Sequence, residues 1–94
     1  MGAGDIVFDP YGRRLYVSMT TTDEILCVDP YTGVVVYSVG LGAKPERLLF
    51  DSEDKRLYVT VPSRNGVVVI DPMKRRIESW IDTGYSPKDL AARI

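Results

Sequence analysis

A repeat of constant spacing constrains this chain more than any other feature of its sequence. The segment 15–17, Leu-Tyr-Val, recurs 42 residues later as the segment 57–59. Other pairs keep the same offset: Phe8-Asp9 with Phe50-Asp51, Asp29-Pro30 with Asp71-Pro72, Gly42 with Gly84, and Pro45 with Pro87. Because the offset never changes, no loop has gained or lost a residue between the copies. The sequence therefore predicts two structurally equivalent units.

Each unit is predicted to contain four short strands. The strand candidates are rich in β-branched and aromatic residues, and clusters of Asp, Pro and Gly separate them. They span residues 6–8, 14–18, 25–28 and 34–39 in the first unit, and 48–50, 56–61, 67–70 and 76–81 in the second. No segment shows sustained helical periodicity. The expected fold class is all-β, with two four-stranded antiparallel sheets.

The hydrophobic pattern of the strands predicts how the sheets pack. Residues 25–28 and 67–70 are apolar at every position. Successive side chains of a strand point to opposite faces, so we expect both faces of these two strands to be covered. Residues 76–81 are more polar, which is typical of a strand at the edge of a sheet.

The repeat closely resembles the YVTN-type β-propeller repeat of surface-layer and YncE-like proteins. The matching residues are 8–17, 25–29, Gly42 and Pro45 in the first unit, and 50–51, 55–59, 67–71, Gly84 and Pro87 in the second. The resemblance covers nearly the whole chain, but the Asn that usually follows Tyr-Val-Thr is replaced by Met19 and Val61. Family members usually carry about seven blades, and this chain carries two.

The resemblance implies that each unit is one propeller blade. Blade 1 is then expected over residues 1–45 and blade 2 over residues 46–87, while residues 88–94 would form a partial inner strand of a further blade, or a tail. The loops 20–24, 40–46, 62–66 and 82–88 would share the face that usually binds ligands. The resemblance also suggests a location at the cell surface or in the periplasm, although residues 1–5 do not look like a signal peptide.

Composition excludes several kinds of chemistry. The chain has no histidine, so Ser-His-Asp and Cys-His catalysis and His-ligated metals are excluded. A single cysteine, Cys27, can form neither an internal disulfide nor a thiolate zinc site. The net charge of −1 gives no reason to expect nucleic acid as a partner, and no apolar run is long enough to span a membrane. We therefore expect no metal, no cofactor and no enzymatic activity.

Four repeated aspartates are the most conspicuous candidates for acid–base or calcium chemistry. Asp9, Asp29, Asp51 and Asp71 each follow a predicted strand. Aspartate in that place caps a turn through hydrogen bonds to the backbone, and none of the four stands in a calcium-loop pattern. We therefore predict a structural role for them.

Cationic residues on the expected ligand face form the candidate binding site. They are Lys44, Arg47, Arg64 and Lys88, together with the aromatic residue Tyr85. Arranged around a ring, they could favour an anionic ligand. Asp5 and Glu46 lie nearby and would offset part of the charge.

These observations favour a non-catalytic β-propeller module that acts in binding or scaffolding. One alternative is a fragment of a larger propeller, such as a lactonase-like or quinoprotein-like enzyme, whose active site lies in other blades. A second is an oligomeric lectin-like carbohydrate binder, although only Tyr85 offers an aromatic ring on the expected ligand face.

Two blades leave two sheet faces uncovered, each with apolar side chains. Soluble monomers rarely expose such patches, and propellers bury them by closing a ring of four to eight blades. We therefore expect either self-association through the blade faces or assembly with other blades of a longer chain. A trimer with six blades is favoured over a dimer, because four blades bend a ring most sharply.

Overall fold

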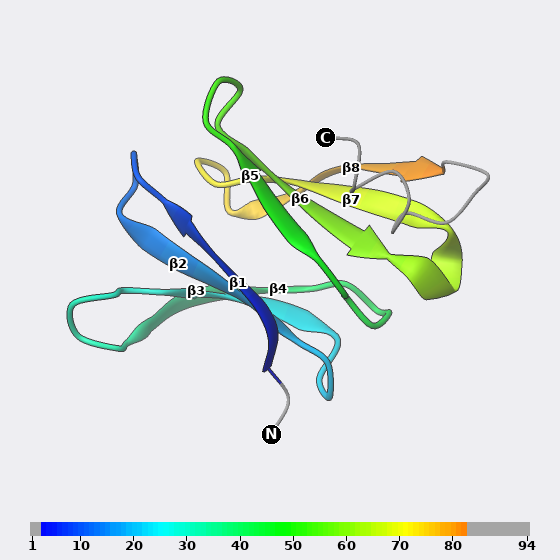
Figure 1. The fold of residues 1–94 in the computed structure, drawn as a ribbon, viewed down its shortest axis with the longest axis horizontal. Coiled ribbons are helices and arrows are strands. Elements are labelled where there is room, and N and C mark those ends of the chain that lie inside the picture. The colour runs from blue at the N-terminus through cyan, green and yellow to red at the C-terminus, as the bar shows by residue number, and fades with distance from the viewer. Residues whose placement is uncertain (1–2, 83–94) are drawn as a thin grey trace.

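In the computed structural model, which describes residues 3–82, the chain folds into two four-stranded antiparallel sheets (Figure 1). The first sheet contains, in order, β1 (Ala3–Asp9), β2 (Arg14–Met19), β3 (Glu24–Val28) and β4 (Val35–Gly40). The second contains β5 (Leu48–Asp51), β6 (Arg56–Val61), β7 (Gly66–Asp71) and β8 (Arg76–Asp82), with a 3₁₀ turn, η1 (Pro62–Arg64), between β6 and β7. The predicted all-β class and the eight strands are confirmed. The expected partial strand or tail at residues 88–94 lies outside the described residues.

The turns at one end of both sheets share a backbone conformation that the sequence did not indicate. Each begins with one of the repeated aspartates and ends four residues later on a residue with positive φ. These residues are Arg13 (φ 54°), Gly33 (φ 76°), Lys55 (φ 55°) and Arg75 (φ 58°). Only one of the four is glycine, and a left-handed conformation costs other residues about 1–2 kcal/mol. Hydrogen bonds from the turn to its aspartate offset that cost.

The glycine of the first turn does not hold the positive φ. Gly12 precedes the left-handed residue of the first turn, and a Cβ added to it would lie 2.8 Å from an Asp9 carboxylate oxygen. The Gly12 amide donates a hydrogen bond to that carboxylate, as the amides of Asp54 and Lys74 do in their own turns. Gly12 therefore serves close packing, whereas the positive φ falls on Arg13.

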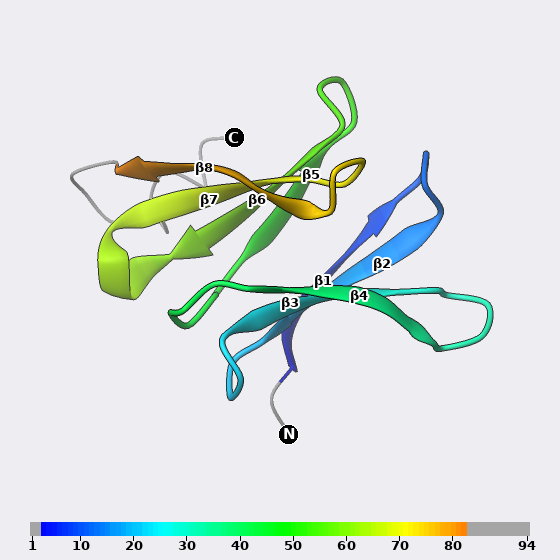
Figure 2. The same cartoon turned by 180° about the vertical axis from the view of Figure 1, so that it is seen from behind.

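The two sheets pack face to face, and β1 lies next to β5 (Figure 2). We call the side of the first sheet that meets the second its front face, and the side of the second sheet that meets the first its back face. The front face of the first sheet contributes Tyr16, Ile25, Cys27 and Val39 to the core. The back face of the second contributes Leu48, Leu57, Val59, Val68 and Ile70. Each fully buried aliphatic side chain stabilises the fold by about 1.5–3 kcal/mol.

The burial of the two apolar central strands differs from the prediction. Every residue of β7 is buried, as expected, but in β3 only Ile25 and Cys27 are buried. Leu26 and Val28 of β3 point to the back face of the first sheet and are partly exposed. The prediction of two covered faces is therefore wrong for β3, because no described part of the chain packs on that side.

The outer strands behave as the sequence predicted. β4 and β8 are edge strands, and most residues of β8 are exposed. A register shift between Val69 and Ile70 bends the pairing of β7 with β8. Within residues 3–82, no helix is long and apolar enough to cross a membrane.

Candidate functional site

The repeated aspartates are occupied by turn hydrogen bonds. In each turn, one carboxylate oxygen accepts a hydrogen bond from the amide two residues later, at 2.8–2.9 Å. Asp9, Asp51 and Asp71 also accept one from the amide three residues later. In the described part of the chain, no group of three or more acidic or cysteine side chains is arranged to hold a metal ion. The turn role predicted for these aspartates agrees with their contacts.

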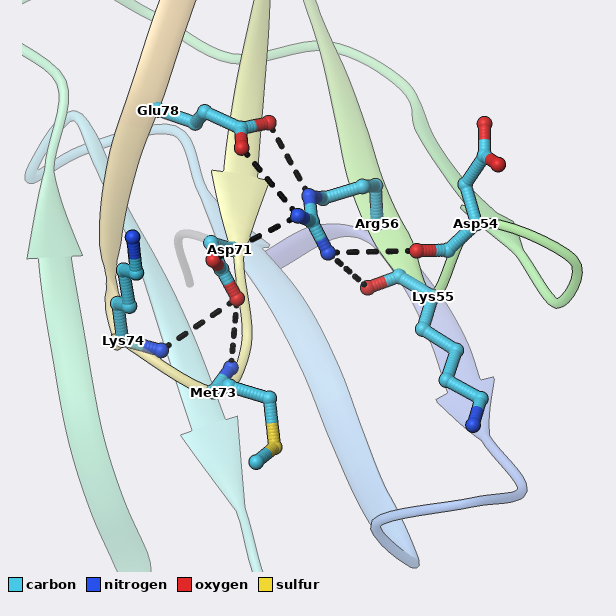
Figure 3. Close-up of polar contacts among 7 residues, drawn as sticks. All are labelled: Asp54, Lys55, Arg56, Asp71, Met73, Lys74 and Glu78. Atoms are coloured by element: carbon cyan, nitrogen blue, oxygen red, sulfur yellow. Dashed lines mark hydrogen bonds and ion pairs between the residues drawn. The ribbon is translucent and has the colours of Figure 1, made fainter.

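Asp71 also belongs to an ion-pair network at the turn end of the second sheet (Figure 3). Arg56 lies between Glu78, at 3.1 Å, and Asp71, at 3.7 Å. Burial alone would raise the pKa of Asp71, but amide donors from Met73 and Lys74 and the charge of Arg56 outweigh it and lower that pKa. The hydrogen bond to Glu78 raises the pKa of Arg56. The network joins β6, β7 and β8 and has a structural role.

Two tyrosine hydroxyls and the Cys27 thiol lie together in the core of the first sheet. The Tyr16 and Tyr37 hydroxyls lie 3.1 Å apart, and their rings meet edge to face. Burial, followed by the contact with Tyr37, raises the pKa of Tyr16 far above its ordinary value. Burial likewise raises the pKa of the Cys27 thiol, which is 1% exposed. These raised pKa values favour the protonated forms of the Tyr16 hydroxyl and the Cys27 thiol.

The cationic residues selected from the sequence lie at the opposite end of the sheets from these turns. Lys44 lies in the β4–β5 loop, Arg47 directly precedes β5, and Arg64 ends η1; all three are exposed. The Arg47 amide donates a 2.9 Å hydrogen bond to the Thr60 hydroxyl, which ties the start of β5 to β6. Tyr85 and Lys88 lie outside the described residues. Lys44, Arg47 and Arg64 thus lie at one loop end of the molecule, which we call the loop face.

Arg64 has a partner that sequence reasoning missed. Its guanidinium stacks on the ring of Trp80 in β8, with the central carbon 4.8 Å from the ring centre. Trp80 is 40% exposed and belongs to a pocket of about 340 Å³. The pocket is lined by Leu41, Arg64, Gly66, Trp80, Ile81 and Asp82. We call this the Arg64–Trp80 pocket.

The backbone explains why this pocket forms. Asn65 closes η1 in a left-handed conformation, and its amide donates a hydrogen bond to the Pro62 carbonyl. Gly66 follows, and a Cβ there would lie 3.1 Å from the Ile81 carbonyl oxygen. Glycine at this position lets β7 and β8 pair closely beneath Trp80. The run Pro62–Gly66 was the signal in the sequence, but only the strand register brings it to Trp80.

A second hollow adjoins the first on the loop face. It has a volume of about 240 Å³ and is lined by Lys44, Pro45, Glu46, Pro62 and Ser63. Ser63 directly precedes Arg64, so the two hollows share the η1 turn. Each hollow is lined by one cation and one acidic residue, Lys44 and Glu46 at this hollow and Arg64 and Asp82 at the first.

Comparisons with known proteins show the fold. Neither a family model nor a curated protein matches the chain. Two β-propeller-containing structures are similar: hydrazine synthase from Kuenenia stuttgartiensis (TM-score 0.77, 24% identity) and apo AztD from Citrobacter koseri (TM-score 0.73, 21% identity). They cover 84% and 89% of this chain, which in turn spans only 22% and 24% of theirs. The YVTN-type assignment stays a prediction, whereas the likeness of the two sheets to blades of larger β-propellers is shown.

Proposed function

We propose that this chain is a non-catalytic β-propeller module that binds an anionic ligand on its loop face. The observation that carries the proposal is the Arg64–Trp80 pair at a pocket, with Lys44 at the adjoining hollow. A guanidinium stacked on an aromatic ring keeps its N–H groups free at the rim, where they can form paired hydrogen bonds to a carboxylate or a phosphate.

The state of the other polar groups supports a binding role. The repeated aspartates are engaged in turns, and the pKa values of Cys27 and Tyr16 are raised by burial. A carbohydrate ligand fits less well than an anion, because the Arg64 guanidinium already occupies a face of the Trp80 ring on which a sugar would stack.

A fragment of a larger propeller remains the second candidate. The similar structures are more than four times as long as the segment they share with this chain, and one of them carries the name of an enzyme. In that case the two blades would supply part of a wall or a rim, and the reacting groups would come from elsewhere.

The intrinsic fluorescence of Trp80 tests the anion proposal directly, because Trp80 is the sole tryptophan of the chain. The chain is titrated with citrate and with inorganic phosphate, with choline chloride at matched ionic strength as the control. We expect a saturable change with at least one anion, none with choline, and loss of the change in Arg64→Gln. Arg76→Gln, at the opposite end of β8, is the matched control and keeps the response.

A flat titration with both anions would contradict anion binding at this pocket. Purified chain that turns over a substrate, and loses that activity when one acidic residue is replaced, would contradict the non-catalytic assignment.

A further inference from the structure

The back face of the first sheet is apolar and uncovered. Ile6 and Phe8 of β1 are 58% and 48% exposed, and Val35 of β4 is 50% exposed. The side chains of Leu15, Val17, Leu26 and Val28 lie on the same face and are partly exposed. A contiguous apolar patch of this kind is typical of an interaction surface.

The repeat shows what such a face packs against. The equivalent residues 42 positions later form the back face of the second sheet, where Leu57, Val59, Val68 and Ile70 are 0% exposed. The front face of the first sheet covers them. The same kind of surface therefore occurs twice in this chain, once covered by a blade and once open.

The internal contact between the sheets thus serves as a template for a second contact. In the proposed contact, the front face of the second sheet takes the place of the front face of the first sheet, and the open back face takes the place of the back face of the second. Each residue of the first sheet is therefore replaced by the residue 42 positions later, and each residue of the second sheet by the residue 42 positions earlier. Phe50, which packs against the core cluster containing Tyr16, becomes Phe8 in this scheme. Val7 and Tyr16 become Leu49 and Tyr58.

The front face of the second sheet has a hollow at the corresponding place. Its volume is about 540 Å³, and it is lined by Leu49, Phe50, Asp51, Ser52 and Tyr58. The template places Phe8 of another blade against Leu49 and Tyr58. The exposed Phe8 ring of one copy could therefore occupy this hollow on the second sheet of another copy.

The charges match as well, at the turn end of the sheets. In the internal contact the Lys55 ammonium lies 4.8 Å from the centre of the Tyr11 ring. The template replaces Tyr11 by Glu53 and Lys55 by Arg13, both of which are exposed. A cation–π contact thus becomes a pair of opposite charges.

The polar contact at the start of the inner strands is not reproduced by the template. In the internal contact an Asp5 carboxylate oxygen accepts a hydrogen bond from the Leu48 amide at 2.9 Å. The template replaces Asp5 by Arg47, and Leu48 by Ile6. The Ile6 amide is already bonded to the other oxygen of its own Asp5. Both oxygens of Asp5 are thus held within its own chain, so the template gives Arg47 no charge partner at this position.

We infer that the open back face of the first sheet docks the front face of the second sheet of another copy of this chain, head to tail. The Arg13–Glu53 pair joins exposed residues from the two outer blades of this same chain, which favours a second copy as the occupant. This inference rests on the proposed role of the chain as a propeller module, and it identifies the partner of that module as a second copy of the chain. Head-to-tail contacts of this type close by rotation, and a six-bladed ring contains three chains.

The middle of the front face of the second sheet is little exposed in the single chain. Val67 and Val69, in the middle of that face, are only 4% and 5% exposed in the single chain. Leu49 and Tyr58 remain partly exposed beside them. Association of separate chains depends on their concentration by mass action, so assembly is expected at micromolar concentrations and above.

Sedimentation velocity over a concentration series is the test. We expect assemblies larger than the 10.5 kDa chain, with the trimer as the end state. Phe8→Glu should weaken assembly at least tenfold. Met73→Glu, which changes an 87% exposed side chain in the β7–β8 turn, is the matched control and should leave assembly unchanged.

A charge swap tests the register of the contact without touching the core. Arg13→Glu and Glu53→Arg should each weaken assembly by about threefold to tenfold, because each places like charges together. The double variant restores opposite charges and should recover assembly. Both side chains are exposed, and circular dichroism checks that every variant is folded.

A chain that stays monomeric at all concentrations, assembly that ignores Phe8→Glu, or a double variant that is no better than the single ones would each overturn the inference. Trp80 pairs with Val68 on the back face of the second sheet, so its titration is read away from the front face that docks. Failure of anion binding with intact assembly therefore rejects only the ligand, and failure of assembly with intact binding rejects only the docking.

Discussion

Truncation of Leu57 provides the sharpest test of how the two sheets are held together. Leu57 is 0% exposed and lies on the back face of the second sheet, between the two sheets. Replacing a buried leucine by alanine costs about 2–5 kcal/mol, with the larger losses at sites that cannot collapse. Sheet pairing on both sides of β6 limits relaxation, so we expect Leu57→Ala to lower the free energy of unfolding by about 3–4 kcal/mol.

The repeat supplies a matched control for this change. Leu15 is the same residue type at the same place in the first unit, but it lies on the open back face and is partly exposed. Leu15→Ala removes less buried area in the single chain, so the expected loss is about 1 kcal/mol. The two sites share the residue type, the equivalent strand and similar neighbouring turns. They differ in whether another sheet packs over the leucine.

Urea unfolding followed by circular dichroism measures both losses. At the lowest usable protein concentration the midpoint should fall much further for Leu57→Ala than for Leu15→Ala, with similar slopes. At high concentration the loss for Leu15→Ala should grow, because assembly covers Leu15, while the intrachain loss for Leu57→Ala should persist. Equal losses for the two variants at low concentration would refute the packing argument.

Two further changes test the turn network and the pocket. Asp71 has a lowered pKa in the folded chain, so its ionised form contributes stability above the unfolded pKa of about 3.9, and that contribution is lost as the pH falls through the folded value. We therefore expect Asp71→Asn to lower the urea midpoint at pH 7 and to narrow its difference from the wild type near pH 3; a constant difference would contradict this. Gly66→Ala places a Cβ 3.1 Å from the Ile81 carbonyl and should cost about 1–3 kcal/mol, with a shift in Trp80 fluorescence. Gly40→Ala, whose Cβ meets nothing within 4 Å, is the matched control, and equal costs would argue against close pairing beneath Trp80.

Much of the fold follows from local signals in the sequence. The constant 42-residue offset predicted equivalent units, and the apolar runs separated by turn residues predicted the strands to within a few residues. The aspartate turns were also predictable, because a carboxylate that follows a strand can bond the amides two and three residues ahead. Even here the position of the left-handed residue was not visible: Gly12 looked like the turn glycine, but Arg13 has the positive φ.

The candidate site could be predicted only in part. The sequence placed Lys44, Arg47 and Arg64 on loops, and strand connectivity alone brings those loops to one end of the sheets. The stacking of Arg64 on Trp80 depends on the register of β7 against β8, including its shift, which is set by packing across the sheet. No spacing along the chain reports that register.

The sequence by itself determined the repeat, the strands, the capped turns and the kinds of chemistry the chain lacks, because each of these depends on residue type and short-range spacing. Only the tertiary structure decided which of two nearly identical surfaces is covered. β3 and β7 are apolar throughout, yet β7 is buried on both sides and β3 on one. Burial depends on what lies on the other side of a strand: the back face of β7 meets the first sheet, whereas the back face of β3 meets no described repeat. That difference is a property of how the repeats stack and not of the local sequence.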